Sequence, residues 1–112
     1  MNDKGKKYED IACKYIKEKL RYKILERNFR IKFGEIDIIA EYKKCLIFIE
    51  VKGGKVFTLP RLRVNEAKIK KIEITANYYL RNQNIIYDKT RLDVIEILDN
   101  GKINYFKGIS RW

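Results

Sequence analysis

The sequence predicts an α/β domain in which a central mixed β-sheet is flanked by helices. Two observations lead to this class: segments of helical and of strand periodicity alternate along the chain, and a strand, a helix and a strand follow one another in its second half. The expected order of elements is α-β-β-β-α-β-β. The chain has 112 residues, of which 46% are hydrophobic, so we expect one domain over residues 1–112.

The first half of the chain predicts one helix and three strands. Apolar residues recur at i, i+3 and i+4 spacing from Tyr8 to Leu20, which is typical of an amphipathic helix. A strand from Tyr22 to Ile31 follows and is ended by Phe33-Gly34. The next two strands, Glu35 to Glu41 and Leu46 to Lys52, are separated by a polar link short enough for an antiparallel hairpin.

The second half predicts one helix and two further strands. Helical spacing from Ala67 to Leu80 indicates the helix, with Asn65 as its N-cap. The segment from Leu92 to Leu98 has the composition of a strand, and Asp99-Asn100-Gly101 predicts a turn into a last strand from Ile103 to Phe106. A right-handed crossover through the helix would make the strands before and after it parallel.

Charge and composition restrict the function. The chain has 26 Lys and Arg against 15 Asp and Glu, a net charge of +11, which favours binding to a polyanion, nucleic acid first. It contains no histidine, which excludes catalytic triads with a histidine, zinc sites with histidine ligands and histidine general bases. Cys13 and Cys45 have no partner pattern and are expected to be buried thiols. No apolar run approaches a membrane span, so we expect no membrane partner and a cytoplasmic location.

The predicted hairpin brings acidic residues together. If its turn centres on Lys43-Lys44, then Asp37 lies opposite Glu50, and Glu35 lies opposite Lys52. All four side chains then project from one face of the sheet. Because side chains alternate along a strand, the other face is expected to carry Ile36, Ile38, Ala40, Ile47, Ile49 and Val51.

Two facing carboxylates predict a cation between them. Like charges directly opposite each other destabilise a strand pair, and Mg²⁺ is usually held by one or two carboxylates with water and substrate phosphate. Asp37 and Glu50 could form such a site, with Lys52 to neutralise charge on a reacting phosphate. The alternative is that these residues and Glu35 form a solvated patch joined by ordinary surface ion pairs.

Three motifs resemble a known family. The runs Ile24-Leu25-Glu26-Arg27-Asn28-Phe29-Arg30, Gly34-Glu35-Ile36-Asp37-Ile38-Ile39-Ala40 and Phe48-Ile49-Glu50-Val51-Lys52 are similar to the YraN-like proteins, an uncharacterised family usually described as candidate endonucleases. The resemblance covers about residues 8 to 98. It implies a restriction-endonuclease-like fold, related to that of archaeal Holliday-junction resolvases. It also implies DNA hydrolysis at an active site made of one Asp on the first strand of a hairpin and a Glu/Asp-x-Lys motif on the second.

The resemblance also implies roles for single residues. Asp37 and Glu50 would be metal ligands for Mg²⁺ or Mn²⁺, Lys52 the catalytic lysine, and Glu9 a first-helix acid that helps to hold metal or water; the alternative for Glu9 is a solvated helix flank. The expected supporting residues are Glu35, Arg91 and Asp93, and an ion pair that holds a strand to a helix would explain the last two equally well. Small nucleases of this architecture often act as dimers, so a homodimer is a further expectation.

DNA contacts are predicted just after the acid-x-Lys strand. The candidate cations there are Lys55, Arg61, Arg63, Lys68, Lys70 and Lys71, and the alternative for each is a solvated surface charge. The family commonly has a basic residue directly after its motif, whereas Lys52 is followed by Gly53-Gly54, so Lys55 would have to take that role. The rival to a nuclease is a non-catalytic nucleic-acid-binding module of the same fold.

Overall fold

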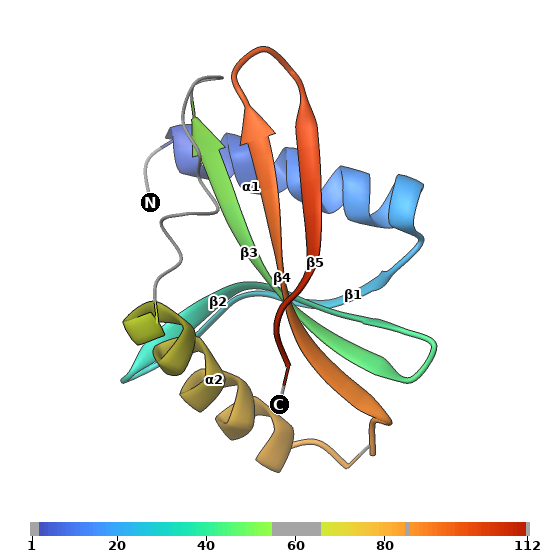
Figure 1. Ribbon diagram of the computed structural model, residues 1–112, viewed down its shortest axis with the longest axis vertical. Helices are drawn as coiled ribbons and strands as arrows, with labels where there is room; N and C mark the ends of the chain where they lie inside the picture. Colours follow the sequence, from blue (N-terminus) through green and yellow to red (C-terminus); the bar gives the residue numbers. More distant parts are fainter. Residues whose placement is uncertain (1–2, 55–65, 85, 112) are drawn as a thin grey trace.

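The computed structural model describes residues 3–54, 66–84 and 86–111, and it has the predicted order of elements (Figure 1). The chain begins with helix α1 and ends with two antiparallel strands. The elements are α1 (Asp3–Tyr15), the π-helical turn η1 (Ile16–Leu20), β1 (Lys23–Ile31), β2 (Gly34–Tyr42), β3 (Cys45–Gly54), α2 (Glu66–Arg81), β4 (Lys89–Leu98) and β5 (Ile103–Arg111). The predicted N-cap Asn65 lies outside the described residues.

The strands form one mixed sheet in the order β1-β2-β3-β4-β5. All neighbours are antiparallel except β3 and β4, which are parallel, as the crossover through α2 predicts. The hairpin of β2 and β3 has the predicted register from Tyr42↔Cys45 to Ile38↔Ile49. The α/β class and the pairing of this hairpin are therefore confirmed, and the arrangement is consistent with a restriction-endonuclease-like fold.

The two helices cover opposite faces of the sheet (Figure 1). Ile47 and Ile49 of β3 pack in one cluster with Ala12 and Ile16 of the first helical segment. Leu46 and Phe48 of the same strand pack in the other cluster, with residues of α2 such as Ile72 and Tyr79. A strand that is apolar on both faces has to be covered on both, which explains the continuous apolar run in β3.

The regular alternation of side chains between the two faces of the sheet breaks in the middle of β1 and β2. Ile38 packs in the α1 cluster, whereas Ile36, two residues away, packs in the α2 cluster, so the prediction that both share a face is wrong. Asn28 of β1, which lies between the pairs Arg27↔Ile38 and Phe29↔Ile36, has a positive φ of 54°. This left-handed residue interrupts the regular pleat, and the strand parity read from sequence does not hold beyond it.

Candidate active site

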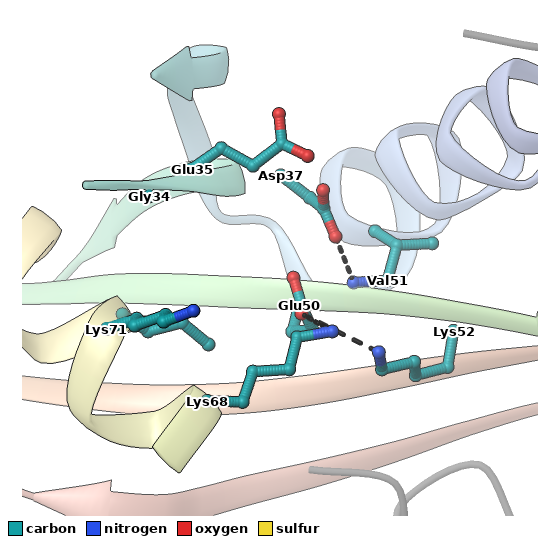
Figure 2. Close-up of a pocket in the computed structure, with 9 residues that line it drawn as sticks. Gly34, Glu35, Asp37, Glu50, Val51, Lys52, Lys68 and Lys71 are labelled. Atoms are coloured by element: carbon teal, nitrogen blue, oxygen red, sulfur yellow. Dashed lines mark hydrogen bonds and ion pairs between the residues drawn. The ribbon is translucent and has the colours of Figure 1, made fainter. Parts of the chain in front are cut away.

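A hollow of about 330 Å³ lies between β2, β3 and the first turns of α2 (Figure 2). We call it the acidic hollow, after the two carboxylates at its centre. It is lined by Gly34, Glu35, Asp37, Glu50, Val51, Lys52, Lys68, Lys71 and Ile72. The structure therefore brings together the predicted Asp37, Glu50 and Lys52.

Asp37 and Glu50 lie side by side where β2 and β3 separate. The ladder ends at Ile38↔Ile49, and the backbone N–H of Val51 donates a hydrogen bond of 2.8 Å to Oδ2 of Asp37 (Figure 2). The carboxylate thus takes the place of a ladder acceptor. Because the two strands no longer pair here, the side chains have the room that forms the hollow.

The two carboxylates share the charge unequally. Burial, together with the hydrogen bond and the negative charge of Glu50, raises the pKa of Asp37 to about 8. Burial also opposes ionisation of Glu50, but the hydrogen bond with Asp37 and the cation Lys68 outweigh it and lower the pKa of Glu50. The metal-free pair therefore holds one proton at neutral pH, as expected for two acids at such close range.

Two lysines face the ionised member of this pair. Nζ of Lys68 lies 2.9 Å and Nζ of Lys52 3.7 Å from Oε2 of Glu50. Burial and the neighbouring Lys68 lower the pKa of Lys52. Burial also opposes the charged form of Lys68, but its bonds with Lys52 and Glu50 raise its pKa. Lys68, predicted only as a DNA contact, is thus part of the acidic hollow itself.

Glu9 lies in a smaller hollow of about 180 Å³ on the α1 side, which Asp37 and Glu35 also line. Its side chain is buried, and Oε1 accepts hydrogen bonds from Arg27 at 3.2 Å and from Nδ2 of Asn28 at 2.8 Å. The structure thus places Glu9 near Asp37 rather than on a solvated flank. Neither Arg27 nor Asn28 had been assigned a role from sequence, although an asparagine inside a strand pattern indicates a left-handed residue.

Glu35 does not meet Lys52, contrary to one of the two roles predicted for it. Its Oε2 accepts a hydrogen bond of 2.7 Å from Arg30 across the β1-β2 hairpin, and both side chains are exposed. This follows from the end of the β2-β3 ladder at Ile38↔Ile49, beyond which Glu35 has no partner strand on the β3 side. Glu35 remains at the edge of the acidic hollow (Figure 2).

Arg91 and Asp93 form an ion pair within β4 that lies away from the acidic hollow. Nε of Arg91 is 2.9 Å from Oδ1 of Asp93, whose side chain is completely buried. Asp93 also accepts hydrogen bonds from the hydroxyl of Tyr105 and from the backbone N–H of Gly108 in β5. Arg91 donates to the hydroxyl of Tyr22 at 2.8 Å. The pair joins β4 to β5 and to Tyr22, the residue just before β1, and not to a helix.

The predicted DNA contacts are only partly described. Lys55, Arg61 and Arg63 lie outside the described residues. Of the three on α2, Lys68 and Lys71 line the acidic hollow, whereas Lys70 is exposed and does not line it. Two of these cations thus lie where a phosphate entering the hollow would meet them.

The donor set fits a magnesium-type ion with few protein ligands. Within residues 3–54, 66–84 and 86–111 no three acidic or thiol groups are close enough to hold a metal together. Asp37 and Glu50 offer two carboxylates, which is the number that Mg²⁺ takes when water and substrate phosphate complete its shell. A divalent cation would also offset the burial and the repulsion that together raise the pKa of Asp37.

The fold and this hairpin site together define an α/β protein of restriction-endonuclease-like architecture, and comparison with known proteins gives the family. Residues 8–97 match the model of "Uncharacterised protein family UPF0102", the YraN family, so the chain belongs to that family. A UPF0102 protein of Kosmotoga olearia is 49% identical, with 97% of this chain and 94% of the relative covered. One of Thermotoga maritima is 41% identical over 93% of this chain and 94% of the relative. The predicted resemblance is confirmed.

The prediction for the two cysteines is confirmed. Cys13 and Cys45 are free and buried. No helix in the described part of the chain is long and apolar enough to cross a membrane.

Proposed function

We propose that this protein is a metal-dependent nuclease that hydrolyses phosphodiester bonds of DNA. The observation that carries the proposal is the meeting of Asp37, Glu50, Lys52 and Lys68 in one hollow between β2, β3 and α2. An acid pair that is costly to ionise without a cation, beside two lysines, suits a site that receives a cation and a phosphate together.

Asp37 and Glu50 would hold Mg²⁺ or Mn²⁺. When bound, such an ion neutralises phosphate charge and lowers the pKa of a bound water, which provides the nucleophile that this histidine-free chain does not supply. Lys52 would donate hydrogen bonds to a phosphate oxygen and stabilise the charge that develops there. Lys68 orients Glu50, and Lys71 at the rim would attract the backbone of the substrate.

Glu9 would act from the α1 side of Asp37. Because Arg27 and Asn28 already hold one of its oxygens, Glu9 is oriented in advance of any ligand. In this position it can accept a hydrogen bond from a water near Asp37, whereas direct ligation of the metal would require that Glu9 move toward Asp37 and Glu50.

One observation favours the rival, a nucleic-acid-binding module without catalysis. In the metal-free protein Lys68 and Lys52 already compensate the charge of Glu50. If this compensation were sufficient, the hollow would bind a phosphate and not a divalent ion.

The test is cleavage of a labelled panel of duplex, single-stranded, flap and four-way-junction DNA with Mg²⁺ or Mn²⁺. The proposal expects cutting that depends on metal and is lost in Asp37→Ala and strongly reduced in Lys52→Gln. Glu26→Gln, which alters an exposed acid of β1 that does not line the hollow, is the matched control and should cut normally. Binding without cutting by the wild-type protein under all these conditions would contradict the proposal and support the rival.

A further inference from the structure

A second hollow, of about 430 Å³, lies at the turn between β2 and β3. We call it the turn hollow. Its lining holds four cations, one carboxylate and one aromatic ring: Arg21, Lys23, Lys43, Lys44, Glu41 and Tyr42. The hairpin extends six residues from Asp37 to Lys43, so the turn hollow lies about 20 Å from the acidic hollow along β2.

Three of these cations adopt a backbone conformation that costs stability. Lys43 and Lys44, the two central residues of the hairpin turn, have φ of 49° and 65°. A two-residue turn with positive φ at both positions is normally made by Asn-Gly. Arg21, which ends η1 with φ 63°, occupies a position usually held by glycine. Left-handed cations around one hollow indicate a site, because such strain gathers at functional positions.

One wall of the turn hollow is the ring of Tyr42, which packs against neighbouring side chains. The ring centroid of Tyr42 lies 5.0 Å from that of Tyr22, and Nζ of Lys43 lies 5.2 Å from the centroid of Tyr42. These contacts orient Lys43 against the ring. The single carboxylate, Glu41, already accepts a hydrogen bond of 3.0 Å from the hydroxyl of Tyr87.

The cations of the turn hollow outnumber its single acid, Glu41, by four to one. None of the four takes part in an ion pair within the described part of the chain, whereas Arg27, Arg30, Lys68 and Arg91 each do. Four cations and one carboxylate around a concave surface leave an excess of positive charge, and the resulting local potential attracts a multiply charged anion.

We propose that the turn hollow binds phosphate groups of a nucleic acid, as a second contact for the strand that leaves the acidic hollow. The inference rests on the proposed binding of nucleic acid and not on its cleavage. A span of about 20 Å corresponds to about six base pairs of duplex, so one substrate can reach both hollows. An anionic membrane fits less well, because the hollow is concave and Tyr42 is its only large apolar group.

The experiment measures affinity for a labelled duplex long enough to span both hollows, as a function of salt and in EDTA, so that cleavage does not intervene. Lys43→Asn/Lys44→Gly removes two charges and supplies the residues that this turn prefers. We expect Tm to rise by roughly 5 °C while affinity falls about tenfold and the salt slope decreases by about 2. Lys43→Gln/Lys44→Gln should weaken binding equally without the rise in Tm.

The control is Lys14→Gln/Lys107→Gln, which removes two exposed charges elsewhere. It should keep most of the wild-type affinity. An equal loss in this control, or unchanged binding in both turn variants, would overturn the inference while the proposed function stands. A turn variant that loses binding to anionic vesicles but not to DNA would overturn it in favour of a membrane contact. A wild-type protein that binds no DNA at any salt would refute both proposals.

Discussion

The sheet contains two buried carboxylate clusters that differ in how completely their charge is satisfied. Asp93 of β4 is fully enclosed, pairs with Arg91, and accepts further bonds from Tyr105 and a backbone N–H. Asp37 of β2 has one backbone donor and a second acid as neighbours, and it faces a hollow. A buried acid with every oxygen bonded stabilises a fold, whereas one that faces another acid in a hollow costs stability and is available for chemistry.

Loss of Asp93 should give the largest effect. Asp93→Ala leaves Arg91 half-buried without its acid and removes the acceptor of two β5 donors, so we expect a loss of about 3–5 kcal/mol in the free energy of unfolding. Urea denaturation measures it. Asp10→Ala, which removes an exposed partner of Arg27, is the control and should cost less than about 1 kcal/mol. Equal losses in both would mean that Asp93 is no more structural than a surface acid.

Replacing Asp37, in contrast, should increase the free energy of unfolding. Its folded pKa of about 8 lies above the ordinary 3.8, so the folded protein binds this proton more tightly than the unfolded chain does. The wild-type protein therefore loses stability as pH rises from about 4 to about 8. Asp37→Asn resembles the protonated acid and removes this loss.

We expect metal-free Asp37→Asn to be more stable than the wild type by about 1–3 kcal/mol at pH 8, with the difference vanishing near pH 4. Urea denaturation at the two pH values measures this. A variant that is destabilised at pH 8, or whose advantage is larger at pH 4, would show that Asp37 is satisfied in the way that Asp93 is.

The same contrast explains how much the sequence could predict. The hairpin register and the meeting of Asp37, Glu50 and Lys52 follow from turn position and strand alternation, both local properties. The reversal of Ile36 does not, because it depends on the left-handed conformation of Asn28 in a neighbouring strand. Nor does the position of Lys68, since a helix that follows residues 55–65 can dock against the sheet in several rotations.

Tyr105→Phe removes a single bond from the satisfied cluster. The hydroxyl of Tyr105 donates to Oδ2 of Asp93, and burial beside this carboxylate raises the pKa of Tyr105. Since Arg91 and Gly108 still satisfy Asp93, we expect a loss of about 1–2 kcal/mol, smaller than that of Asp93→Ala. Thermal unfolding measures it. A loss as large as that of Asp93→Ala would mean that the cluster depends on this bond alone.

The smallest effect should come from the rim of the acidic hollow. Glu35 is exposed and bonded to Arg30, so Glu35→Gln should change the free energy of unfolding by less than about 0.5 kcal/mol. The same substitution removes one negative charge from the entrance of the hollow, so DNA affinity should rise slightly, by about twofold, and depend more steeply on salt. Urea denaturation and salt-titrated binding measure the two quantities, with Glu26→Gln, an exposed acid of β1 that lines neither hollow, as the charge-matched control. A large loss of stability would place Glu35 with Asp93 as part of the fold. Weaker binding than in the control would instead mean that this carboxylate belongs with Asp37 and Glu50, which would extend the unsatisfied acid cluster to the rim of the hollow.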